Sequence, residues 1–113
     1  MLSINLFGQD YALSNKLRVA YRVQGQHDHK PYTEVFSGVG DMPIEDQIGI
    51  IYESFWCANP EARDKISRPQ FLEEYLDKYD VKTLMEQLRE IIQGIMGVKD
   101  DDLAVAASEA NPQ

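Results

Sequence analysis

The strongest constraint on this 113-residue chain is an apolar repeat near its C-terminal end. Between residues 81 and 96, apolar side chains recur at offsets of three and one, which is the period of one face of an α-helix. They are Val81, Leu84, Met85, Leu88, Ile91, Ile92, Ile95 and Met96. Asp80 is placed to cap this helix and Gly97 to end it. Because such a face must be covered by other elements, the chain is predicted to be mainly α-helical.

The apolar stripe of this helix is wide, covering about 160° of its circumference at about 100° per residue. Packing against a single neighbouring helix requires a narrower apolar stripe than this. We therefore expect part of the stripe to contact a partner or a second subunit. The candidate partner-binding residues on it are Leu88, Ile91, Ile92, Ile95 and Met96.

Signals for helix starts and ends upstream predict shorter helices, giving four to five in all. Ser67 and Gln70 have the spacing of a capping box, and Pro31 suits the first turn of a helix. Ser14 or Asn15 can accept the free amide hydrogens that open the first helix. The expected spans are residues 15–25, 31–36, 43–59 and 68–79. The predicted inward face of the first span consists of Leu17, Ala20 and Tyr21.

The first thirteen residues are predicted to form a short β-hairpin. Leu2 to Leu6 alternates apolar and polar residues, and an extended pattern resumes from Tyr11 to Leu13. Gly8 lies between the two segments and marks the turn. The hairpin and the helices together are expected to form one domain over residues 1–97.

Residues 98–113 contain no aromatic side chain and include three consecutive aspartates. Such a segment buries too little apolar area to offset its ordering entropy. We therefore expect a flexible acidic tail.

Aromatic residues at helical spacing supply the predicted core. They are Tyr52, Phe55, Trp56, Phe71, Tyr75 and Tyr79. The core is the favoured position for each of them, with the rim of the core as the alternative for Trp56 and Tyr75, which makes these two further candidates for contact with a partner.

The net charge of −8 opposes binding to nucleic acid or to an anionic membrane. No segment is apolar for long enough to span a bilayer or to act as a signal peptide. A single cysteine fits a reducing cytosol. Residues 1–30 carry a net +2 and the remainder −10, a distribution that can steer a partner or a second copy. For Arg18 and Arg22, which share a helix face, pairing with internal acids is favoured over contact with another molecule.

The sequence contains histidines, paired carboxylates, closely spaced glycines and a cysteine, which can form metal, catalytic or phosphate-binding sites. In each case a structural role explains the pattern better than a chemical one. His27–His29 lacks the additional ligands that a tetrahedral metal site needs. The paired carboxylates Glu45–Asp46 and Glu73–Glu74 fall in early helical turns, where acids favour the helix dipole. Gly38–Gly40 lacks the flanking features of a phosphate-binding loop, and Cys57 has no histidine close in sequence. We therefore expect no catalytic residue, no cofactor and no metal.

Two other functions remain open on the sequence. An acidic inhibitor that mimics nucleic acid requires carboxylates along one face at the spacing of phosphates. A small carboxylate-dependent hydrolase requires a concave pocket with at least two acids whose pKa values are displaced.

The order of features resembles one known family. Three segments carry the resemblance: residues 4–11 (Ile-Asn-Leu-Phe-Gly-Gln-Asp-Tyr), residues 44–59 with a proline after the helix, and residues 66–96, which include Ser-Arg-Pro-Gln-Phe-Leu-Glu-Glu-Tyr-Leu-Asp. This layout is similar to that of the tail assembly chaperones of long-tailed bacteriophages and prophages, in their Gram-positive branch. The polar loop at residues 24–30 and the length of the tail depart from it.

The resemblance implies a non-catalytic role in tail morphogenesis. The protein would coat the tape measure protein, keep it soluble and help to recruit tail tube (major tail) protein subunits, with homo-oligomers possible. It would act in the host bacterial cytoplasm and be absent from the mature virion.

Overall fold

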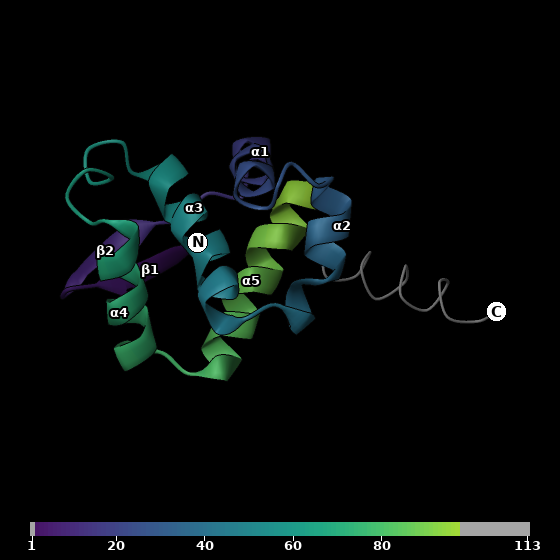
Figure 1. The fold of residues 1–113 in the computed structure, drawn as a ribbon. Helices are drawn as coiled ribbons and strands as arrows, with labels where there is room; N and C mark the ends of the chain where they lie inside the picture. The colour runs from purple at the N-terminus through teal and green to yellow at the C-terminus, as the bar shows by residue number, and fades with distance from the viewer. Residues whose placement is uncertain (1, 98–113) are drawn as a thin grey trace.

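A two-stranded hairpin and five α-helices make up residues 2–97, the part of the chain that this computed structural model describes (Figure 1). The elements are β1 Ser3–Leu6, β2 Gln9–Ala12, α1 Leu17–Gln26, α2 Tyr32–Ser37, the 3-10 helix η1 Val39–Asp41, α3 Ile44–Ala58, α4 Arg68–Lys78 and α5 Val81–Met96. The predicted mainly helical class with an N-terminal hairpin is confirmed. The predicted flexible tail, residues 98–113, lies outside the described residues.

The hairpin pairs β1 and β2 antiparallel, with Ile4 opposite Tyr11 and Leu6 opposite Gln9. Its two-residue turn consists of Phe7 and Gly8, whose φ angles are 53° and 79°. Positive φ at both central residues gives a turn whose twist matches that of the strands. Ile4 and Leu6 are buried, so the predicted alternation places one face of the hairpin on the core.

Helix α3 is the centre of the fold, with α4 and the hairpin on one side and α1 and α5 on the other (Figure 1). Every residue from Gln47 to Phe55 is buried, so this helix is covered on all sides. The rings of Phe55 and Phe71 lie 5.5 Å apart between centroids, and the Tyr52 ring lies 5.3 Å from that of Phe71. The predicted aromatic core therefore joins α3 to α4.

The termini of α4 and α5 follow the local sequence signals closely. Ser67 and Gln70 form the predicted capping box of α4. The Asp80 side chain accepts a hydrogen bond from the Thr83 amide at 2.9 Å, which lowers the pKa of Asp80. Gly97 ends α5 in the left-handed conformation, at φ 71°.

The predicted cap of α1 is wrong. Lys16 occupies the N-cap position, and no side chain caps the helix. Ser14 instead binds α3: its amide donates to the Ser54 carbonyl at 3.2 Å, and the Ser54 hydroxyl donates to the Ser14 carbonyl at 2.5 Å. The segment before α1 is thus held by a tertiary contact rather than by a capping side chain.

The inward face of α1 also differs from the prediction. Val19, Ala20 and Val23 are buried, whereas Leu17 and Tyr21 are each 68% exposed. Both the Leu17–Tyr21 pair and the Val19–Val23 pair have the spacing of a helical face, so periodicity alone does not choose between them. The valine face is buried because it packs against α3.

Two glycines, one in close contact and one open, provide a matched test of how the segment before α1 packs on α5. A Cβ added at Gly94 of α5 would lie 2.5 Å from the Asn15 Cβ, whereas nothing lies within 4 Å of a Cβ added at Gly25 of α1. Gly94→Ala is therefore expected to lower the free energy of unfolding by about 1–3 kcal/mol, as overpacked sites do. Gly25→Ala is expected to raise it by about 0.5–1 kcal/mol. Urea denaturation measures both, and stabilisation by Gly94→Ala would contradict the close approach of Asn15 to α5.

Candidate functional site

An apolar groove of about 430 Å³ lies between α5 on one side and α2 with η1 on the other. Its apolar lining consists of Phe36, Val39, Met85, Leu88, Ile92 and Met96. The polar residues around it are Thr33, Ser37, Arg89 and Gln93. In Figure 1, α2 lies beside the half of α5 that approaches the end of the described chain.

The groove exists because α2 is short and packs mainly on α1 and η1, while α5 packs mainly on α3. Helix α2 has six residues, and only Val35 and Phe36 of these are buried. The two helices therefore border a common hollow, whose floor includes the buried Leu88.

The chemistry of the lining indicates which kind of occupant the groove suits. Sites for small polar ligands combine an apolar wall with several converging polar groups. Here six side chains of the lining are apolar, and the charged group of the lining, Arg89, is exposed at the edge. Such a surface matches apolar side chains of another protein better than it matches a polar metabolite.

Three of the predicted partner-binding residues line this groove: Leu88, Ile92 and Met96. Met96 is 45% exposed, whereas Leu88 is almost fully covered and forms the floor. Ile92 is half-buried and also packs on the core. The stripe on α5 is wide because one edge of it faces the groove and the other faces α3.

Two of the predicted partner-binding residues are corrected to core positions. Ile91 has no exposed surface and Tyr75 has 2%. Ile91 belongs to the buried cluster that joins α5 to the rest of the core, and Tyr75 stacks on Phe71 at 6.1 Å between ring centroids. Ile95 is partly buried against the same core. Ile91 and Ile95 belong to α5 and Tyr75 to α4, and both helices pack on α3.

Trp56, the remaining predicted partner-binding residue, is half-buried and is held by internal contacts. The guanidinium groups of Arg22 and Arg63 each lie 3.5 Å from the centroid of the indole ring. Cation–π attraction at this distance fixes the ring between two charged groups. Trp56 therefore links α1 to the turn that follows α3.

A buried carboxylate lies next to this stack. Glu53 is 1% exposed, and its two oxygens accept from Arg22, at 2.5 Å, and from Arg68. Internal pairing of Arg22 with an acid is therefore confirmed, while Arg18 lies over the Tyr21 ring at 5.8 Å. The Glu53 carboxylate joins three helices, since Arg22 belongs to α1 and Arg68 to α4.

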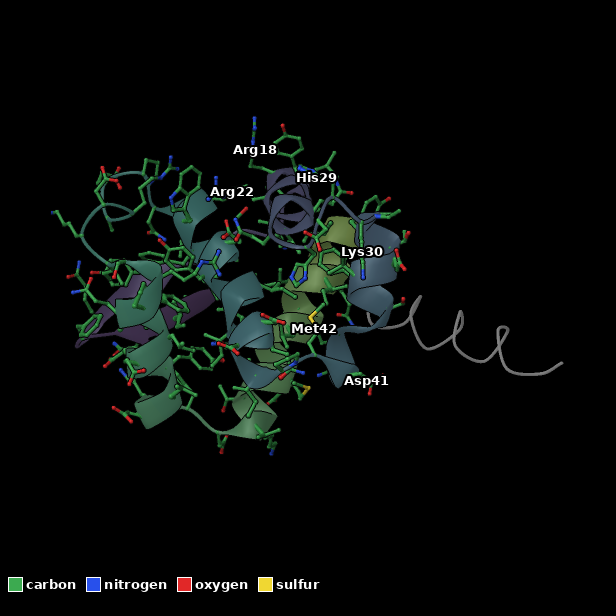
Figure 2. The ribbon with its side chains drawn as sticks, in the orientation of Figure 1. Arg18, Arg22, His29, Lys30, Asp41 and Met42 are labelled. Carbon is green, nitrogen blue, oxygen red and sulfur yellow. The ribbon has the colours of Figure 1, made fainter. Side chains whose placement is uncertain are left out.

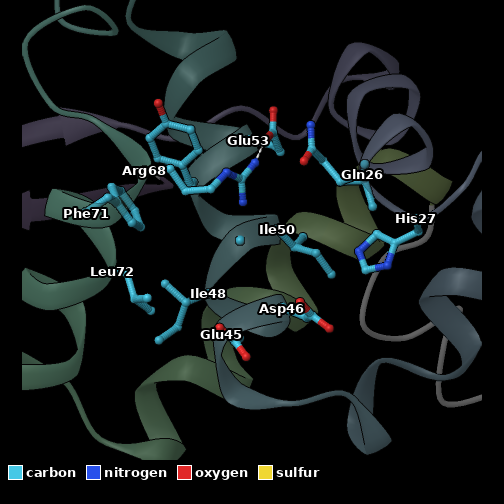
Figure 3. Close-up of a pocket in the computed structure, with 13 residues that line it drawn as sticks. Gln26, His27, Glu45, Asp46, Ile48, Ile50, Glu53, Arg68, Phe71 and Leu72 are labelled. Atoms are coloured by element: carbon cyan, nitrogen blue, oxygen red, sulfur yellow. Dashed lines mark hydrogen bonds and ion pairs between the residues drawn. The ribbon is translucent and has the colours of Figure 1, made fainter.

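A second cavity, of about 240 Å³, lies beside this ion pair (Figure 3). Its polar lining includes His27, Glu45, Asp46, Glu53 and Arg68. Arg22 and Arg68 already engage Glu53, and within residues 2–97 no hydrogen bond joins His27 to a carboxylate. No group of three or more potential metal ligands occurs in that same part of the chain.

Sequence reasoning missed the α2 and η1 side of the groove. The sequence pattern places Phe36 in a short helix and Val39 in a linker, and six residues are too few to show a helical period. The available signal was the pair of apolar residues on either side of the break at Gly38.

Cys57 of α3 is half-buried, and burial raises the pKa of its thiol. The nearby Arg22 and Arg63 have a smaller, opposite effect. A raised pKa disfavours the nucleophilic thiolate form.

Within the described residues, no helix is long and apolar enough to cross a lipid bilayer. Comparisons with known protein families, with characterised proteins and with solved structures found no match to this chain.

Proposed function

We propose that this protein is a non-catalytic tail assembly chaperone, and that its groove between α2 and α5 holds the apolar face of an amphipathic helix from a tape measure protein. The observation that carries this proposal is the groove itself, an open apolar surface on an otherwise well-packed domain. The layout of the sequence, which resembles that family over residues 1–97, supports the choice of client.

The dimensions of the groove suit a helix. From Met85 to Met96 the α5 wall runs for about 16 Å, at about 1.5 Å per residue. A client helix laid along it presents apolar side chains at i, i+3 or i+4, and i+7, which is the pattern of helix-in-groove recognition.

Charge supports the chaperone role. A long client with exposed apolar helices aggregates unless its surface is covered, and the net charge of −8 gives the coated complex mutual repulsion. We further propose that the complex recruits tail tube protein in the host bacterial cytoplasm and that the chaperone does not remain in the mature virion.

Substitution of Met96 tests the groove. Met96→Asp is expected to weaken binding of peptides from the amphipathic helices of the tape measure protein by about tenfold or more, because a charge replaces an apolar contact. Leu76→Asp is the matched control, since Leu76 is 47% exposed on α4 and Met96 is 45% exposed. Fluorescence anisotropy measures the affinities. Equal weakening by the two variants, or none by Met96→Asp, would contradict the assignment of the groove.

The second cavity favours one alternative, a small hydrolase, because it brings His27 and Asp46 to the same space (Figure 3). That alternative predicts turnover of chromogenic ester or glycoside substrates that is lost in Asp46→Asn. A nucleic-acid mimic is less well supported, because the acidic residues are spread over α2, α3, α4 and α5.

A further inference from the structure

The groove between α2 and α5 lies next to the point where the described part of the chain ends. Met96, the last residue of α5, lines the groove, and Gly97 ends the helix in the left-handed conformation. A residue in this conformation turns the chain away from the helix axis. Residues 98–113 lie outside the described residues, but they follow directly from here. They are therefore tethered beside an open apolar surface.

The sequence of residues 102–112 has the pattern of a short helix with one apolar face. Asp102 can cap its start, and alanine, the best helix former, occupies four of the eight positions from 103 to 110. Pro112 disfavours a helical residue before it, which ends the helix at about residue 110. The positions that share one face, at spacings i, i+3, i+4 and i+7, are Leu103, Ala106, Ala107 and Ala110. This is the spacing that helix-in-groove recognition requires of a client.

The lengths of the connection and of the groove suit this helix. Six residues, 97–102, separate Met96 from Leu103, and connections between packed helices are commonly about two to eight residues long. Eight helical residues extend for about 12 Å at about 1.5 Å each, which fits along the α5 wall of the groove. Because alanine side chains are small, such a helix can also lie close to α5.

Arg89 supplies charge complementarity at the edge of the groove. It is exposed, and within residues 2–97 it has no ion-pair partner. In an antiparallel helix that starts with Leu103 opposite Met96, each further residue faces one residue earlier in α5, since both helices rise equally per residue. This register places Glu109, which flanks the apolar face, beside Arg89.

We propose that residues 103–110 form a helix that lies antiparallel to α5 in the groove and covers it until a client binds. By itself this segment is too short to hold a helix and buries too little apolar area to become ordered. The groove supplies the missing area, and the tether supplies a high effective concentration. A client helix with larger apolar side chains then competes for the same surface, so the segment is a weak internal inhibitor. This competition rests on the proposed function, whereas the docking of the segment does not.

Methyl NMR of the full chain, with ¹³C in the methionine methyl groups, tests the docking. Met85 and Met96 line the groove and report on its occupant, whereas Met42, which packs on the core at the end of η1 (Figure 2), does not line it and is the internal reference. Leu103→Asp is expected to shift the Met85 and Met96 signals and to leave the Met42 signal in place. Val105→Asp is the matched control, because it adds the same charge on the opposite face of the helix. It is expected to shift none of the three signals.

A charge exchange tests the antiparallel placement. Arg89→Glu is expected to lower the ratio of docked to free segment about twofold to fivefold, the range for an exposed ion pair. Adding Glu109→Arg is expected to restore the ratio. The signals are expected to stay the same on about twentyfold dilution, because a tethered segment binds independently of protein concentration.

Met85 and Met96 signals that do not shift in Leu103→Asp would overturn the inference, as would equal shifts in Val105→Asp. Signals that change on dilution would also overturn it, since they would assign the groove to the segment of a second copy. A charge exchange that fails to restore docking would overturn the antiparallel placement.

Peptide affinities separate this inference from the proposed function. Leu103→Asp is expected to raise the affinity for tape measure peptides by about twofold or more, because the competing segment is released. Methyl shifts without binding of any such peptide would overturn the proposed function alone. Peptide binding at equal affinity in Leu103→Asp and the wild type would overturn the inhibitory role of the segment alone.

Discussion

Replacing both Arg22 and Arg68 by methionine is expected to lower the free energy of unfolding by about 3–5 kcal/mol. In the native protein Glu53 is 1% exposed and its carboxylate is bound by both guanidinium groups. The variant removes both opposite charges from this buried group. Because a domain of this size is stable by only about 5–15 kcal/mol, this loss is a large part of the total. Urea denaturation followed by circular dichroism gives the value.

A triple variant tests whether the unpaired Glu53 carboxylate causes this loss of stability. Adding Glu53→Met to the double variant removes the unpaired charge and is expected to recover much of the lost stability, as in other buried ion pairs replaced by apolar residues. Arg89→Met, which removes an exposed arginine, is expected to change stability by less than about 0.5 kcal/mol. No recovery on removal of Glu53 would show that the lost arginine packing, rather than the orphaned charge, destabilises the double variant.

Ile91→Asp is expected to unfold the domain. Truncating a buried isoleucine costs about 2–5 kcal/mol, and placing an unpaired carboxylate in the same site adds the cost of desolvating a charge. Ile91 has no exposed surface, so the aspartate cannot reach solvent without moving α5. The helical signal in circular dichroism is expected to fall and the chain to aggregate.

Met96→Asp is the control for this effect, because Met96 is five residues further along the same helix and 45% exposed. It is expected to keep the wild-type helical signal and to lose only client binding. The opposite outcome, a folded Ile91→Asp that no longer binds client, would place Ile91 on the binding surface, as the periodicity of the sequence predicts.

The features that were predicted well depend on interactions between residues close in sequence. The capping box of Ser67 with Gln70, the Asp80 cap and the Gly97 terminus each involve hydrogen bonds or dihedral angles within one helical turn. The hairpin turn at Gly8 is of the same kind. Such signals locate helices and strands because their energy does not depend on the rest of the fold.

The errors concern which face of a helix is covered. The apolar residues of α1 allow two faces, and those of α5 form a stripe wide enough for two neighbours. Ile91 and Met96 have the same apolar character, but α3 covers the first and leaves the second open.

Sequence alone was sufficient for the helical class, the capped starts of α4 and α5 and the acidic charge, because each depends on composition or on neighbours within a few residues. The binding groove and the Glu53 ion pairs required the tertiary structure. Arg22 and Arg68 are 31 and 15 residues away from Glu53. Phe36 lines the groove opposite α5, although this helix begins only at Val81. Contacts at these separations arise from how the helices pack together, and local sequence patterns do not specify that packing.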